Sequence, residues 1–139
     1  MSGSDCIFCK IIGGEIPSFK LMENEHAFAL MDINPAHEGH ALVVSREHAA
    51  DVYSLSADSV AHVAQAAQRV ATAVRDELEP DGLNLIQANG PGAAQSVAHF
   101  HIHVLPRVLD DNLSLNWPVN AGDMSAIGAL AERIRARLT

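Results

Sequence analysis

The run "HFHIHVLPR" at residues 99–107 constrains the fold of this chain more than any other stretch. Its histidines alternate with the apolar residues Phe100, Ile102 and Val104. On a helix the imidazoles would point around the cylinder, whereas on a strand they share one face and the apolar residues share the other. The run therefore predicts a half-buried strand over residues 99–106, whose histidines face water, a ligand or a metal.

The rest of the chain predicts an α+β protein with one long covering helix. Short apolar segments predict further strands at residues 19–24, 27–33, 40–45 and 82–89. Apolar residues recur at every third or fourth position over residues 57–78, which predicts a helix with Ser56 as its N-cap. A short helix or turn is expected before Gly13, and a last helix over about 123–138 with Asp123 as its cap. We expect a single domain over residues 1–139.

Composition excludes several classes of function. A chain of 139 residues with 48% hydrophobic residues can build one core, but it has no apolar run long enough to span a membrane. The N-terminus lacks the features of a secretory signal, so we expect a cytoplasmic protein. The net charge of −8 argues against non-specific nucleic-acid binding. Cys6 and Cys9 form a C-x-x-C pair that could bind metal, act in redox chemistry or be buried thiols.

A metal ion alone does not account for the three histidines of the run. Cα atoms two apart on a strand are separated by roughly 6.7 Å, and the outer pair by about 13 Å. One zinc ion with bonds of about 2 Å could take two neighbours but would hardly collect all three. A solvent-facing strand that happens to be rich in histidine is the alternative. The Gly-rich run "GPGAAQS" directly before it favours an anion site instead, because small residues let backbone N–H groups approach an oxyanion.

The run "QSVAHFHIHV" resembles the Q-S-V-x-H-φ-H-φ-H-φ signature (φ, apolar) of the histidine triad (HIT) family. The segments "CIFCKIIGGEIP", "DINPAHEGHALVV" and "LSLNWP" resemble the other recurring blocks of that family in the same order. The resemblance covers nearly the whole chain and is to a bacterial-type member with a C-x-x-C pair. It implies a nucleotide hydrolase or transferase that acts on an α-phosphorus through a covalent nucleotidyl-histidine. It also implies a homodimer that joins two five-stranded antiparallel sheets into one of ten strands.

The resemblance implies the following roles at the site. His101 would be the nucleophile, since neutral imidazole is a good nucleophile near pH 7. Its other ring nitrogen would donate a hydrogen bond to the backbone carbonyl of His99. His103 would donate to a non-bridging phosphate oxygen, and Ser96 would share a proton with the leaving group. His40 matches a further histidine near the phosphate. The residues implied to bind substrate are Asp32 at the ribose, Ile33 at the base, and Asn89, Gln95 and Val97.

The loop and the cysteines refine this picture. Ala88 stands where many relatives carry asparagine, with Asn89 next to it, and Ala94 replaces a common glycine, which weakens the expected phosphate contacts. The resemblance to the galactose-1-phosphate uridylyltransferase branch of the superfamily implies a structural zinc ion, the only cofactor expected. Its ligands would be Cys6, Cys9, His48 and His99.

Functions of two classes fit the sequence. The first is a nucleoside phosphoramidase or dinucleoside polyphosphate hydrolase that releases AMP or a similar nucleotide. The second is a nucleotide-binding regulatory or scaffold protein with little turnover. "HVLPR" resembles the dinucleotide hydrolases, whereas "CIFCKII" and "QSV" resemble the phosphoramidases, so the substrate stays open. Trp117 would either approach the nucleotide site of the partner or cap its own core.

Overall fold

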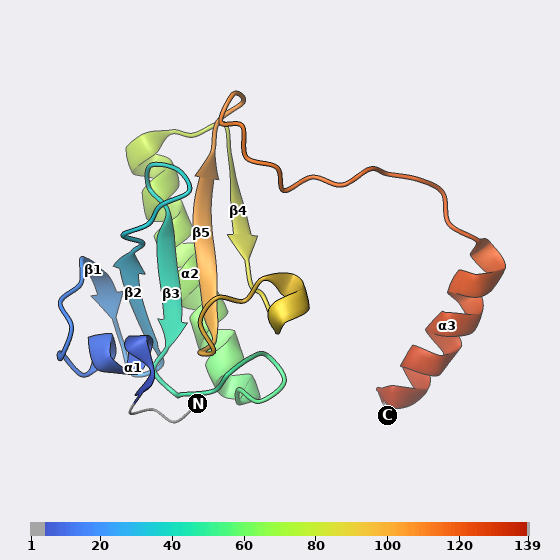
Figure 1. Cartoon of the computed structure of the whole chain (residues 1–139), viewed down its shortest axis with the longest axis horizontal. Coiled ribbons are helices and arrows are strands. Elements are labelled where there is room, and N and C mark those ends of the chain that lie inside the picture. Colours follow the sequence, from blue (N-terminus) through green and yellow to red (C-terminus); the bar gives the residue numbers. More distant parts are fainter. Residues whose placement is uncertain (1–4, 139) are drawn as a thin grey trace.

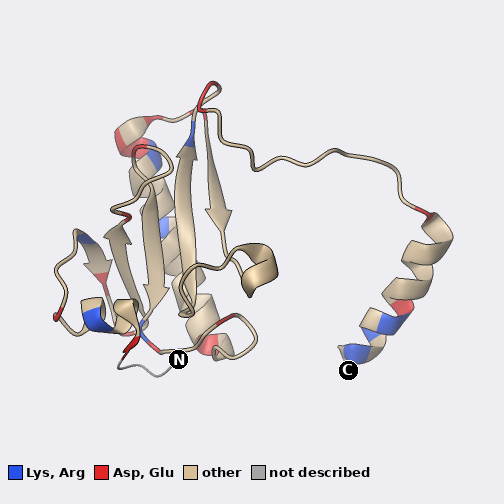
Figure 2. Cartoon of the chain, viewed as in Figure 1, with Lys and Arg blue, Asp and Glu red and all other residues tan. Residues whose placement is uncertain are grey.

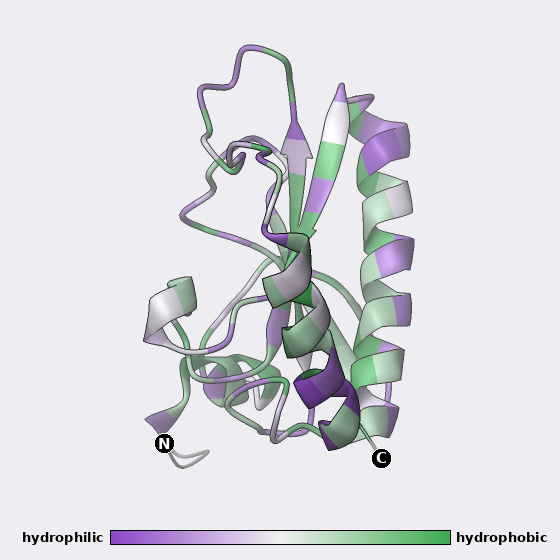
Figure 3. Ribbon diagram, turned by 90° about the vertical axis from the view of Figure 1, so that its right-hand side faces the viewer, coloured by the Kyte–Doolittle hydropathy of each residue, from purple (hydrophilic) through white to green (hydrophobic). Residues whose placement is uncertain are grey.

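The computed structural model describes residues 5–138 and contains one antiparallel sheet of five strands in the order β1-β2-β3-β5-β4. A long helix, α2, lies along one face of the sheet (Figures 1 and 3). This arrangement confirms the predicted fold class. The strands are β1 (Lys20–Glu23), β2 (Ala27–Met31), β3 (Ala41–Ser45), β4 (Gly82–Ile86) and β5 (His101–Arg107).

Helix α2 (Ala57–Leu78) has the bounds that its apolar periodicity predicts. The Ser56 side chain accepts a hydrogen bond from the Ser59 N–H, and the helix ends at Glu79, in a left-handed conformation with φ of 47°. Several of the buried side chains of α2 are small, namely Ser59, Ala66 and Ala67. Its buried residues pack on one face of the sheet with Phe100 and Val104, as the alternation in the histidine run predicts.

The opposite face of the sheet carries a second core beneath helix α1 (Ile7–Ile12). Phe8 of α1 packs with residues of β2 and β3, namely Phe28, Leu30, Leu42 and Val44. Helix α1 ends at Gly13, as expected. The histidines of β5 lie on this second face, so the structure places them under the N-terminal helix.

Strand β5 begins at His101, so the predicted strand over residues 99–106 starts two residues too early and ends one residue too soon. The His99 N–H turns back to the carbonyl of Val97, and the Phe100 N–H donates to the carbonyl of Ala49. These bonds engage the N–H groups of His99 and Phe100 outside the ladder, so the strand begins at His101, although the Phe100 carbonyl already accepts from the Ser45 N–H of β3.

The C-terminal part of the chain stands apart from the sheet. A turn at residues 109–110 is tied back to β5 by the ion pair of Arg107 with Asp111. An extended segment over residues 114–123 then leads to helix α3 (Met124–Arg137), which has no buried residue (Figure 1). The Asp123 carboxylate caps this helix as predicted, accepting from the Ser125 and Ala126 N–H groups. Trp117 in the segment is 79% exposed, so it does not cap its own core. Within residues 5–138, none of the helices is long and apolar enough to cross a membrane.

Candidate active site and metal centre

The structure brings three histidines together on the α1 face of the sheet, from β5 and the start of β3. The rings of His101 and His103 are 5.0 Å apart, and those of His40 and His103 are 5.1 Å apart, between centroids. The sheet register sets this grouping, since β3 and β5 are antiparallel neighbours with Leu42 opposite His103. His101 is buried, so part of the histidine face meets protein rather than water.

The proton on His101 is fixed by its neighbour in the chain. The His101 Nδ1–H donates to the backbone carbonyl of His99 at 2.7 Å. A neutral imidazole holds one proton, so this bond leaves the lone pair on Nε2. The geometry that the family resemblance implies for a nucleophile is therefore present.

The tautomer of His103 is set by a hydrogen bond from His40, whose own tautomer is set by the backbone. The Ala36 N–H donates to His40 Nδ1 at 3.0 Å, so the proton of neutral His40 lies on Nε2. That Nε2–H donates to His103 Nδ1 at 2.9 Å, which leaves the His103 proton on Nε2. His103 can then donate to an oxyanion. The Asp32 carboxylate lies 3.6 Å from His40 Nε2 and stabilises this arrangement.

Burial keeps these histidines neutral. It lowers the pKa of His101, although the hydrogen bond to His99 and the charge of Asp32 oppose the change. Burial, then the neighbouring His101 and His40, lower the pKa of His103 to about 4. Burial also lowers the pKa of His40, again opposed by Asp32. Near pH 7 the cluster is neutral, which suits a nucleophile and hydrogen-bond donors.

The loop before β5 is held by the amide side chains that the sequence assigns to substrate. Gln95 accepts from the Gly90 N–H at 2.8 Å and donates to the carbonyls of Ala50 and Val97 at 2.6 and 3.0 Å. Asn89 accepts from the Val52 N–H at 2.7 Å. These bonds shape the loop around its short 3₁₀ helix, η2 (Pro91–Ala93). The substrate-binding roles of Gln95, Asn89 and Val97 stay predictions.

The remaining predicted residues, Ser96 and Ile33, lie at the surface. Ser96 is exposed, and Ile33 is 74% exposed, which leaves it accessible to a base. Sequence reasoning missed Phe8, whose ring packs edge-on against His99 and His101 at 5.8 and 5.1 Å. Its position inside "CIFC", between two candidate metal ligands, was a signal that could have identified it.

Cys6, Cys9, His48 and His99 converge at the other end of the histidine run. Four distances between their ligand atoms are 3.2 Å (Cys6 Sγ to His99 Nδ1), 3.2 Å (Cys9 Sγ to His48 Nδ1), 3.6 Å (Cys9 Sγ to His99 Nδ1) and 3.1 Å (His48 Nδ1 to His99 Nδ1). Tetrahedral zinc with bonds of about 2.0–2.3 Å needs ligand atoms separated by about 3.3–3.8 Å. The donor set and its spacing therefore fit zinc.

Two further features of the cluster favour a metal. The His99 Nε2–H donates to the Ser45 carbonyl at 2.6 Å, so its Nδ1 lone pair points at the cysteines. Burial raises the pKa of the Cys9 thiol to about 11, and the hydrogen bond with Cys6 and the charge of Cys6 add to this increase. A bound cation would offset this cost of forming the thiolate.

Comparison with known proteins shows that the chain belongs to the histidine triad family, because the HIT domain model matches residues 13–109. An adenosine 5′-monophosphoramidase from Saccharomyces cerevisiae is 38% identical over 134 residues, which cover 96% of this chain and 82% of the yeast protein. A HIT family protein from Bacillus anthracis superposes with a TM-score of 0.92 at 33% identity, covering 99% of this chain and 100% of that one. A zinc-bound histidine triad family protein from Mycobacterium smegmatis gives 0.76 at 34% identity, with 99% and 97% covered.

Proposed function

We propose that this protein is a HIT-family hydrolase that releases AMP, or a similar nucleotide, from nucleoside phosphoramidates or dinucleoside polyphosphates. One observation carries the proposal: the hydrogen bonds leave a lone pair on His101 Nε2 and a proton on the Nε2 of its neighbour His103. The activity in the name of the similar yeast protein makes a phosphoramidate the first substrate to test.

The reaction would proceed in two displacements at the α-phosphorus. His101 Nε2 attacks phosphorus, the bond to the leaving group breaks, and the Ser96 hydroxyl transfers a proton to that group. His103 donates its Nε2–H to a non-bridging oxygen as negative charge develops. Water then attacks phosphorus and returns a proton to the Ser96 oxygen, the bond from phosphorus to His101 breaks, and the nucleotide leaves. Asp32 would hold the ribose and Ile33 the base.

The metal cluster would act on structure rather than chemistry. Zinc held by Cys6, Cys9, His48 and His99 would tie α1 to the segment that enters β5. His99 also supplies the carbonyl that orients His101, at 2.7 Å. A fixed His99 backbone therefore positions the nucleophile without any contact between metal and substrate.

A substrate panel tests the enzyme against the alternative of a binding or scaffold protein. Adenosine 5′-phosphoramidate and diadenosine polyphosphates are incubated separately with the purified chain, and AMP release is measured. Turnover of either substrate supports the hydrolase, and the faster one identifies the branch. Tight AMP binding without turnover of any substrate would favour a regulatory or scaffold role.

Activity should persist below the ordinary pKa of histidine. The reaction needs neutral His101, whose pKa lies below 6.5, so the protein keeps this form as the pH falls past 6.5. Activity is lost only when the pH falls through the lowered pKa. A profile of kcat/KM from pH 5 to 8 measures this loss, which forms the acidic limb of the profile. Asp32→Asn should move the acidic limb to lower pH, because the Asp32 carboxylate raises the pKa of His101 and the substitution removes that charge. A limb at or above pH 6.5 would contradict the assignment.

We also propose a homodimer built at the edge of the sheet. Strand β4 lies at one edge, where its unpaired backbone groups can bond to a second copy and make ten strands. Exposed Trp117 would then lie across the partner, near its nucleotide site.

Light scattering at micromolar concentration should give twice the chain mass of 14.8 kDa. AMP should change the fluorescence of Trp117, the only tryptophan, if the residue approaches the site. A monomer would disprove the dimer. A dimer whose fluorescence ignores AMP would disprove only the contact of Trp117.

A further inference from the structure

Helix α3 carries an apolar stripe that stays largely exposed in the described part of the chain, residues 5–138. Ile127, Leu130, Ile134 and Leu138 recur at helical spacing and are 52%, 47%, 53% and 81% exposed. No residue of α3 is buried, and Figure 1 shows the helix standing away from the sheet and from α2. An amphipathic helix of this kind is stabilised by packing its stripe on another surface.

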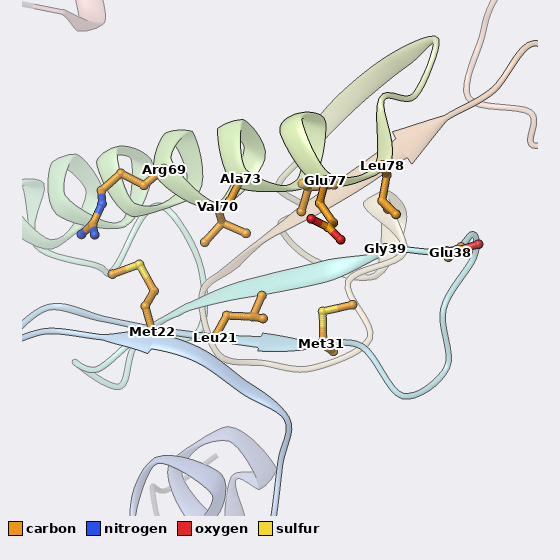
Figure 4. Close-up of a pocket in the computed structure, with 11 residues that line it drawn as sticks. Leu21, Met22, Met31, Glu38, Gly39, Arg69, Val70, Ala73, Glu77 and Leu78 are labelled. Atoms are coloured by element: carbon orange, nitrogen blue, oxygen red, sulfur yellow. The ribbon is translucent and has the colours of Figure 1, made fainter.

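The structure also contains an open apolar groove. A cavity of about 530 Å³ lies between the C-terminal half of α2 and strands β1 and β2, on the face opposite the histidines (Figure 4). Met22, Met31 and Val74 line it, and Leu78 closes one end. Flexible methionines are common in grooves that accept an apolar helix face.

We propose that α3 of one copy docks in this groove of a second copy, reciprocally, within the proposed homodimer. The dimensions match: at 1.5 Å per residue the stripe from Ile127 to Leu138 spans roughly 16 Å, and α2 borders the groove for roughly 14 Å. The stripe would pack on Met22 and Val74 as one helix in a groove.

Charge also fits the two surfaces. Arg133, Arg135 and Arg137 lie near the C-terminal end of α3. Glu38 and Glu77 line one end of the groove, and Arg69 lines the other (Figure 4). Figure 2 shows basic residues gathered at the end of α3, and mostly acidic residues with basic ones among them around the C-terminal end of α2. Opposite charges at the rim of an apolar contact favour one orientation of the docked helix.

The strand order and the position of α3 together favour a second copy as the occupant. The groove lies beneath β1 and β2 at one edge of the sheet, whereas β5 delivers the C-terminal segment beside β4 at the other edge. Figure 1 shows α3 beyond β4, on the side away from β1. A two-fold axis at the β4 edge would place the sheet of a partner there. The same contact then forms twice, as a closed isologous dimer requires.

Charge substitution on the stripe tests the contact. Ile134→Glu should raise the dimer dissociation constant at least about tenfold in sedimentation at increasing dilution, because a carboxylate would be buried in the groove. Ala129→Glu puts the same side chain on the opposite face of α3 and should leave the constant unchanged. Ala73→Glu, at an exposed position that lines the groove, should weaken the dimer as Ile134→Glu does. Circular dichroism checks that each variant is folded.

Cross-linking tests the occupant. A tagged chain with Leu130→Cys is mixed with an untagged chain with Ala73→Cys and oxidised, with the unsubstituted mixture as control. A disulfide between the two chains is expected. No link in the mixture, or a link within one chain that carries both substitutions, would overturn the proposal. If Ile134→Glu leaves the dissociation constant of a stable dimer unchanged, the groove contact alone is overturned. If the unsubstituted protein is a monomer, the dimer is overturned as well. Neither readout depends on turnover, so AMP release is judged separately.

Discussion

His101→Ala is expected to lower AMP release from adenosine 5′-phosphoramidate by at least about a thousandfold while AMP still binds. The substitution removes the Nε2 lone pair, and no other group takes over a covalent step. The ring of His101 is buried beneath Phe8, so its loss leaves a small cavity but keeps the surfaces at Asp32 and Ile33 that would hold the nucleotide. Turnover is measured by AMP release, and binding by titration calorimetry.

Two variants control for general damage. His62→Ala removes a histidine of α2, on the other face of the sheet, and should keep full activity. His103→Ala removes a donor rather than the nucleophile, so it should slow the reaction without preventing capture of a nucleotidyl-protein by rapid quenching and mass spectrometry. More than a few per cent of activity in His101→Ala would rule out the covalent route.

Zinc removal is expected to have the largest effect on stability. Elemental analysis of the purified protein should find close to one zinc per chain, and Cys9→Ser should lose it. The melting temperature should then fall by about 10 °C, which corresponds to a loss of about 3 kcal/mol in a domain of this size. The cause is that Cys6, His48 and His99 would no longer be held together across α1 and the entry to β5.

The effect should separate structure from chemistry. Cys9→Ser at a temperature where it remains folded should keep much of the turnover, because the metal touches no substrate. His101→Ala should bind zinc normally, although it is inactive. A metal-free preparation with full activity and an unchanged melting temperature would remove zinc from the account of this protein.

Local sequence patterns were sufficient to predict which helices and strands the chain forms. The bounds of α2 follow from apolar spacing and the Ser56 cap, because both act within a few residues of the chain. The alternation around His101 identified a strand and its apolar face for the same reason. Resemblance over nearly the whole chain predicted the family, and the match of the HIT domain model confirms it.

The tertiary structure decided how distant segments meet. His101 owes its tautomer to the His99 carbonyl and His103 owes its tautomer to His40, which lies 63 positions away in the chain. Cys6 and His99 are 93 positions apart, and no local rule brings their ligand atoms to 3.2 Å. Such contacts depend on how the sheet and α1 pack, and packing reflects the summed burial of many side chains.

Sequence by itself predicted an amphipathic helix over about residues 123–138, because periodicity and the Asp123 cap are local. Only the tertiary structure showed that this helix has no buried residue and that an apolar groove remains open beside α2. The β5 start is a similar case: bonds from His99 and Phe100 to Val97 and Ala49 overrode a pattern that favoured a longer strand. Hydrophobic spacing states which face of an element is buried, but the partner that buries it is set by the arrangement of the whole chain in space.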